Sequence, residues 1–157
     1  MAIELAYIGV EVADPAALSD MLQNVIGLTP GEPVGATQTW RNDDRVQRVL
    51  VTEGPRNDAT VVGFEAPSVA DANRVAEKLR TLGFAVEQGS AADCAERYVD
   101  VLYRTTAPWG VEVEVVSGLA NSPTRFKSEL VPGGFKTSGM GFGHCVFAIP
   151  DAEANFS

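Results

Sequence analysis

A repeated strand-and-helix pattern constrains the fold of this chain more than any other feature of its sequence. An alternating apolar segment over residues 7–14 runs into Pro15 and a helical pattern, and residues 61–68 repeat that segment before a second helical pattern. Residues 144–151 begin the same pattern a third time. The repetition predicts a fold assembled from copies of one small unit.

The first two copies carry the signals that begin and end helices. Asp14 is expected to cap the first helix, which ends at Gly27, and Ser68 is expected to cap the second, which ends at Gly83. Pro15 fits the first helical position. Apolar residues at helical spacing predict the buried faces, which are Leu18, Met21, Leu22 and Val25 in the first helix and Val75, Ala76, Leu79 and Leu82 in the second.

Three strand-like runs follow each helix, so each copy is expected to form a β-α-β-β-β unit. The runs cover residues 29–35, 36–41 and 45–52 in the first unit and 85–88, 98–106 and 111–116 in the second. We predict an α+β fold in which paired units form a curved, barrel-like mixed sheet with the helices outside. The expected divisions are a domain over 1–118 (units 1–57 and 58–118), a linker over 119–140, and the first strand and helix start of a further domain over 141–157.

Period-2 alternation assigns the side chains of the three opening strands to two faces. The face under the helices is expected to hold Ile8, Val10 and Val12, with Val62, Phe64 and Ala66, and with Cys145, Phe147 and Ile149. The opposite, concave face is expected to hold Tyr7, Gly9 and Glu11, with Val61, Gly63 and Glu65, and with His144, Val146 and Ala148. Tyr7, Val61 and His144 are therefore equivalent positions, and only His144 is a metal-ligand residue type.

The charge balance restricts the class of partner. Twelve Lys and Arg stand against 21 Asp and Glu, giving a formal net charge of -9, which opposes binding to nucleic acid or to anionic lipid. No signal-peptide pattern or long apolar run is visible, and two cysteines without a motif are typical of a reducing compartment. We therefore expect a cytoplasmic protein whose partners are small molecules or protein chains.

Three segments of the sequence resemble one known family. Residues 5–10 (Leu-Ala-Tyr-Ile-Gly-Val) and residues 106–114 (Thr-Ala-Pro-Trp-Gly-Val-Glu-Val-Glu) resemble an opening and a closing strand of extradiol ring-cleavage dioxygenases of the dihydroxybiphenyl dioxygenase type. Residues 130–135 and 139–146 are similar to the linker and the Gly-x-Gly-His strand that introduce their catalytic domain. These enzymes are members of the vicinal oxygen chelate, or glyoxalase/bleomycin resistance, superfamily. The resemblance covers nearly the whole chain and corresponds to the amino-terminal half of such an enzyme.

The resemblance implies an iron(II) enzyme that cleaves a catechol, such as the bicyclic 2,3-dihydroxybiphenyl, with dioxygen, and that forms homo-oligomers. Two His and one Glu would hold iron by one face and leave positions open for catecholate and dioxygen. The resemblance assigns His144 as a metal ligand and Val146 as a substrate-binding residue, and it places no catalytic residue within the chain. The remaining ligands are expected beyond Ser157, so this chain alone is expected to hold no iron and to be inactive.

Other interpretations of these residues stay open. Without the resemblance, a lone His is more often a surface or hydrogen-bonded residue than a ligand. Glu114 matches a metal-ligand Glu of single-domain relatives, but the acidic face also fits neutralisation by neighbouring arginines. These residues are Glu11, Glu65, Glu112 and Glu114 with Arg41, Arg45, Arg48 and Arg104. A Cys145–His144 nucleophile is disfavoured because adjacent residues alternate between faces, and Trp40 and Trp109 are favoured as packing anchors over ligand-stacking residues.

Two other functions compete with the enzyme. One is a non-catalytic small-molecule binding protein of the glyoxalase/bleomycin resistance type. Residues 118–157 argue against it, because a protein of two units has no use for a third opening strand, but it would gain if they folded back over the concave pocket. The other is a scaffold that pairs with a separate chain through an exposed strand at residues 142–149.

Overall fold

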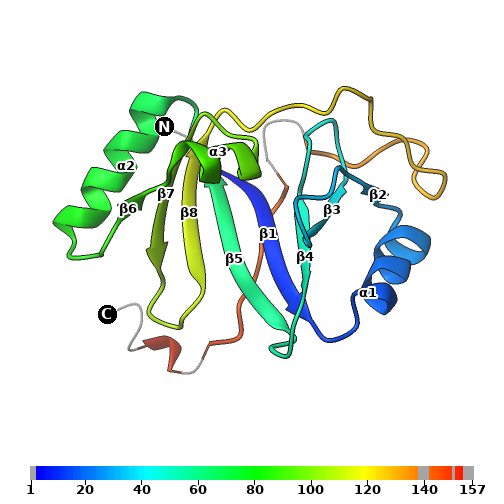
Figure 1. Cartoon of the computed structure of the whole chain (residues 1–157), viewed down its shortest axis with the longest axis horizontal. Coiled ribbons are helices and arrows are strands. Elements are labelled where there is room, and N and C mark those ends of the chain that lie inside the picture. Colours follow the sequence, from blue (N-terminus) through cyan, green and yellow to red (C-terminus); the bar gives the residue numbers. More distant parts are fainter. Residues whose placement is uncertain (1–2, 138–141, 150, 154–157) are drawn as a thin grey trace.

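A computed structural model describes residues 3–137, 142–149 and 151–153 (Figure 1). The elements in chain order are β1 (Glu4–Val12), α1 (Pro15–Met21), the π-helical turn η1 (Leu22–Ile26), β2 (Thr29–Pro30), β3 (Gln38–Arg41), β4 (Val49–Glu53), β5 (Asp58–Glu65), α2 (Val69–Thr81), β6 (Glu87–Gln88), α3 (Ala91–Arg97), β7 (Val101–Thr106) and β8 (Glu112–Ser117). The strands form one eight-stranded mixed sheet in the order β2-β3-β4-β1-β5-β8-β7-β6. Within the described residues the sheet is open, because the end strands β2 and β6 do not pair with each other.

The sheet consists of two equivalent halves that meet at its centre. In the first half β1 pairs in parallel with β4, and in the second half β5 pairs in parallel with β8 in the same way. The two opening strands, β1 and β5, then pair antiparallel to join the halves. This arrangement confirms the prediction of an α+β fold built from paired units.

The predicted helix starts are confirmed, whereas part of each predicted buried face is wrong. The Asp14 carboxylate accepts a hydrogen bond from the Ala17 N–H at 2.9 Å, and the Ser68 hydroxyl accepts one from the Asp71 N–H at 3.1 Å. Gly27 ends the first helix in the left-handed region at φ 89°. The predicted core residues Met21, Val25 and Leu82 are instead 42%, 73% and 64% exposed. The π-helical turn changes the side-chain phase after Met21, and Leu82 lies past the last turn of α2.

The short helix α3 was not predicted from the sequence, although its starting signal is present. Ser90 and Asp93 form a complete capping box, in which each side chain bonds to the backbone of the other residue. The Ser90 hydroxyl and backbone N–H hold the pKa of the Asp93 carboxyl well below its ordinary value. A helix therefore occupies the chain between β6 and β7.

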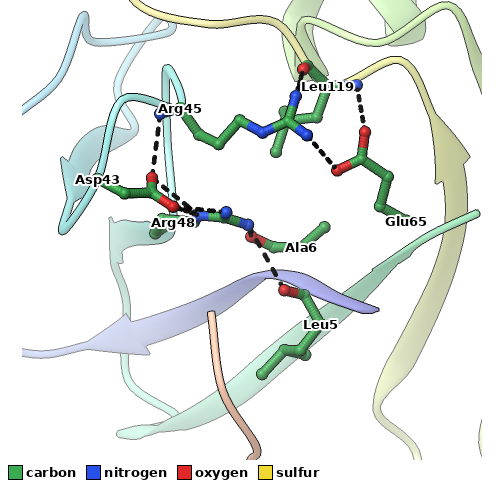
Figure 2. A network of polar contacts seen from close by, with 7 residues as sticks. All are labelled: Leu5, Ala6, Asp43, Arg45, Arg48, Glu65 and Leu119. Carbon is green, nitrogen blue, oxygen red and sulfur yellow. Dashed lines mark hydrogen bonds and ion pairs between the residues drawn. The ribbon is translucent and has the colours of Figure 1, made fainter. Parts of the chain in front are cut away.

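A polar network in the loop between β3 and β4 replaces the beginning of the strand predicted over residues 45–52. Figure 2 shows the Arg48 guanidinium between the Asp43 carboxylate and the carbonyl oxygens of Leu5 and Ala6. The Arg48 side chain is 4% exposed and lies 2.7 Å from Asp43, and this contact with Arg48 holds the pKa of the Asp43 carboxyl below its ordinary value despite burial. These bonds hold the loop against β1, and β4 begins only at Val49.

The two faces of the sheet carry different coverings. On the face covered by α1 and α2, here the helix face, α1 and η1 cover an apolar cluster with Leu22, Trp40 and Val51, and α2 covers another with Ala72 and Ala76. On the opposite face, here the network face, Tyr7, Leu50 and Leu102 form the core with residues around α3. Trp40 is thus a packing anchor, as predicted.

Residues 142–149, here the docked segment, run along the helix face between α1 and α2 (Figure 1). The strand expected here is not formed, because only the Phe142 N–H, which donates to the Leu5 carbonyl at 2.8 Å, joins its backbone to the sheet among the described residues. The burial nevertheless alternates as predicted, with 145, 147 and 149 half-buried and 144, 146 and 148 exposed. None of the helices in the described residues is long and apolar enough to span a lipid bilayer.

Candidate functional site

The Glu114 carboxylate is the most completely enclosed charge of the described chain. Its side chain is 0% exposed and lies on the network face of β8. The Tyr7 hydroxyl donates to Glu114 Oε2 at 2.5 Å, Arg97 Nε donates to the same oxygen at 2.9 Å, and Arg104 Nε donates to Oε1 at 3.2 Å. Three donors from three elements therefore occupy one carboxylate.

The pairing register brings these groups together. Gly63 lies beside Tyr7 on one side and beside Glu114 on the other, and Arg104 is the partner of Glu114 on β7. A Cβ atom on Gly63 would lie 2.4 Å from the Tyr7 ring, so glycine is what allows the ring to cross β5 toward β8. Arg97 arrives from the last turn of α3. The cluster thus depends on both halves of the sheet and on the helix that the sequence did not predict.

Burial and charge shift the acid-base behaviour of this cluster. Burial, followed by the Glu114 carboxylate, raises the pKa of Tyr7 well above its ordinary value. Burial opposes protonation of Arg97, but the Glu114 charge outweighs it and raises the pKa of Arg97. Burial and then Glu114 also raise the pKa of the neighbouring Glu112 carboxyl. The raised pKa values keep the Tyr7 phenol neutral and the Arg97 guanidinium charged at neutral pH.

Arginine neutralisation of the acidic face is confirmed, although the set of arginines differs from the prediction. Arg104 pairs with Glu114, and Arg45 pairs with Glu65 at 3.2 Å. Arg97 is an additional partner, because α3 brings it to the sheet. The predicted Arg41 and Arg48 have other partners, namely the Thr124 carbonyl and the Asp43 carboxylate.

A polar cleft of about 390 Å³ lies beside the cluster, and Glu11, Arg56, Arg97 and Glu112 are among its lining residues. Arg56 faces Glu11 at 3.9 Å across its rim. The binding-protein hypothesis would have gained support if residues 118–157 had folded back over the concave face. The docked segment lies on the helix face instead, so it does not cover this cleft.

The structure separates the two candidate metal-ligand residues, His144 and Glu114. His144 is exposed on the docked segment, whereas Glu114 is buried on the other face of the sheet. Val146 shares the exposed side with His144 and is 86% exposed. Cys145 faces the sheet, where burial raises the pKa of its thiol, and it packs among apolar side chains as expected for a core residue. The disfavoured Cys–His nucleophile is thus not assembled.

The described residues do not form an iron site by themselves. No group of three or more His, Cys, Asp or Glu side chains in that part of the chain is arranged to hold a metal ion. His144 is the sole histidine of the sequence. Glu114 already has three hydrogen-bond donors, and two of these are cationic. The chain therefore offers one exposed imidazole and no partner ligand for it within the described residues.

Comparison with known proteins relates the chain to ring-cleaving dioxygenases. Residues 5–54 match the family described as dihydroxybiphenyl dioxygenase BphC D1. The biphenyl-2,3-diol 1,2-dioxygenase of Paraburkholderia xenovorans (strain LB400) is 31% identical over 153 residues, which are 95% of this chain and 50% of that protein. The 3-methylcatechol 2,3-dioxygenase of Pseudomonas putida is 32% identical over 151 residues, with 96% of this chain and 52% of that protein covered.

Solved structures agree with the sequence comparison. A catechol 2,3-dioxygenase superposes with a TM-score of 0.86 at 26% identity, over 97% of this chain and 55% of its own. The halotolerant catechol dioxygenase BphC superposes with a TM-score of 0.91 at 24% identity, over 98% of this chain and 52% of its own, which shows the shared fold. The chain spans about half the length of the curated relatives it matches.

Proposed function

We propose that this chain is the non-catalytic domain and first ligand segment of an extradiol dioxygenase. The support is that nearly its whole length is homologous to about half of each of several such enzymes. The division into a domain over 1–118, a linker over 119–140 and the start of a catalytic domain over 141–157 is part of this proposal. The exposed position of His144 is the observation that carries it. The imidazole has no bonding partner among the described residues, and it is therefore available to an ion.

The substrate of the whole protein would be a catechol, with dioxygen as co-substrate. Support for this comes from relatives named for biphenyl-2,3-diol and for 3-methylcatechol. A relative from Rhodococcus jostii (strain RHA1) is named an iron-dependent extradiol dioxygenase and is 30% identical over 154 residues. We propose that His144 supplies one ligand to iron(II) and that Val146 lies beside the substrate. The homo-oligomer and the cytoplasmic location remain predictions.

The described residues do not by themselves make up a metal site, so no step of ring cleavage is assigned to them. What the chain contributes in this proposal is a rigid sheet and one presented imidazole. In this proposal the Glu114 carboxylate has a structural role, because it is fully buried and already accepts hydrogen bonds from Tyr7, Arg97 and Arg104.

The test compares the 157-residue chain with the protein continued through its reading frame. Both are loaded with iron(II) without oxygen, and 2,3-dihydroxybiphenyl is then added in air while the yellow product is followed. We expect product only from the longer protein, and none from its His144→Ala variant. The matched control is Val25→Ala, at a side chain 73% exposed on η1, which should keep full activity. Turnover by the 157-residue chain, or full activity of His144→Ala in the longer protein, would contradict the proposal.

A further inference from the structure

The docked segment is attached to the sheet at points on both sides of His144. Before it, the Phe142 N–H donates to the carbonyl oxygen of Leu5 on β1 at 2.8 Å. After it, Cys145 and Phe147 pack against an apolar cluster whose buried members are Leu5, Val62 and Val111. The backbone of His144 therefore lies between two fixed points that are five residues apart in the sequence.

One of these attachments is an aromatic contact between Phe147 and Trp109. The rings of Phe147 and Trp109 have centroids 6.4 Å apart and are tilted by 40°, which is within the range of favourable aromatic pairs. Trp109 lies in the turn between β7 and β8, so the same turn that precedes Glu114 also holds the docked segment. This contact agrees with the prediction that Trp109 is a packing anchor.

Attachment by alternate residues determines the direction of the side chains between them. In an extended segment, neighbouring residues point to opposite sides. Because Cys145 and Phe147 point into the sheet, His144 and Val146 point away from it, as their exposure shows. A metal ligand must be held within about 0.5 Å and 10–20° of its working position. His144 has no hydrogen bond from its ring among the described residues, so the restraint that the structure shows acts on its backbone and on the side of the segment from which the imidazole projects.

We propose that Phe147 and Trp109 are positioning residues that hold the His144 imidazole in the direction from which it binds the metal. This inference rests on the proposed function, since it takes His144 as a ligand. It assigns the first domain a specific task, which is to provide the surface on which the ligand segment is held. The contact acts through the backbone of the docked segment.

The first experiment uses the 157-residue chain and does not depend on activity. Backbone ¹⁵N relaxation of His144 should give an order parameter typical of rigid structure, about 0.85, and Phe147→Ala should lower it to below about 0.6. Phe147→Leu, which keeps an apolar anchor, should restore most of the order. Val146→Ala is the matched control, because that side chain is 86% exposed beside the same histidine. Hydrogen exchange of the Phe142 amide should accelerate in Phe147→Ala and not in Val146→Ala.

The second experiment tests the consequence for the metal in the longer protein. Loss of the anchor in Phe147→Ala should weaken iron(II) binding about 10- to 100-fold, the range found when groups that orient a metal ligand are removed. Phe147→Leu should regain most of that affinity. Unchanged order at His144 in Phe147→Ala would overturn the anchoring, and unchanged iron affinity despite lost order would overturn the positioning role. If the unmodified longer protein bound no iron, the proposed function would fail, and with it the role of His144 as a metal ligand. The relaxation experiment would still decide whether Phe147 anchors the docked segment.

Discussion

Glu114 and His144 are both metal-ligand residue types on strand-like segments, yet the molecule holds them in opposite ways. Glu114 is fully buried on the network face and is bonded by Tyr7, Arg97 and Arg104. His144 is exposed on the docked segment, on the other side of the sheet, and only its backbone is restrained. Two residue types that can both bind metals thus become a structural group in one place and an available group in the other.

The difference shows that whether a side chain is available to bind a metal depends on its bonding partners more than on its chemical type. A buried carboxylate must be neutralised and hydrogen-bonded, since removal of an ion from water is costly. Here two arginines meet that requirement, and the carboxylate is enclosed with its counter-charges at 0% exposure. An exposed imidazole has no such requirement, so the fold can leave it unpaired. The following substitutions test this contrast, with the largest loss of stability expected for the buried carboxylate and the smallest for the exposed histidine.

Removal of the buried carboxylate should have the largest effect. Glu114→Ala leaves Arg97 partly buried without its counter-charge, and breaking a buried pair in this way costs about 3–5 kcal/mol. Urea unfolding followed by circular dichroism measures the loss. Glu112→Ala, at a side chain 42% exposed, is the control and should change stability by less than about 1 kcal/mol. Equal losses for the two variants would mean that the Glu114 cluster has no special structural role.

The close approach of Tyr7 to Gly63 gives the second expectation. Gly63→Ala places a methyl group 2.4 Å from the Tyr7 ring, and such overpacking costs about 1–3 kcal/mol. Gly133→Ala is the control, because nothing lies within 4 Å of the added atom. Thermal unfolding of the two variants should therefore differ clearly. A neutral Gly63→Ala would indicate that the ring can move away from β5 without loss.

The Tyr7 hydroxyl gives a pH-dependent expectation. Tyr7→Phe removes a hydrogen bond to a buried carboxylate and should cost about 1.5–3 kcal/mol at pH 7. Because the pKa of Tyr7 is raised in the folded protein, its contribution is complete below the unfolded pKa of about 10 and is lost as the pH rises toward the folded pKa. The gap in urea midpoint between the wild type and Tyr7→Phe should therefore narrow from pH 8 to pH 11. A gap that stays constant would show that Tyr7 ionises alike in both states.

Substitution of the histidine should have the smallest effect on stability. His144→Ala removes an exposed side chain without hydrogen bonds in the described residues, so the free energy of unfolding should change by no more than about 0.5 kcal/mol. Chemical denaturation of the 157-residue chain gives this value directly. A loss similar to that of Glu114→Ala would show that the imidazole has a structural partner, and the contrast between the two residues would disappear.

Much of the fold could be predicted because its signals are local. The caps at Asp14 and Ser68 and the stop at Gly27 depend on a few neighbouring residues, and the alternation over 144–149 appears in the burial even where no strand forms. The helix α3 could have been found from its Ser90 and Asp93 capping box. The exposure of Val25 could not be predicted, because the regular helical spacing of the sequence does not indicate the π-helical turn that carries this residue.

For the candidate site, too, local features could be predicted from the sequence and contacts between distant residues could not. The sequence by itself determined the repeated unit, the two faces of the first two opening strands, and the family to which the pattern is similar, whereas the equivalence of Tyr7, Val61 and His144 stays a prediction. Only the tertiary structure decided that Arg97 from α3 completes the Glu114 cluster and that Trp109 holds the segment carrying His144. The physical reason is that caps and periodicity act between near neighbours in the chain, whereas ion pairing and ring packing join residues that only the register of the sheet brings together.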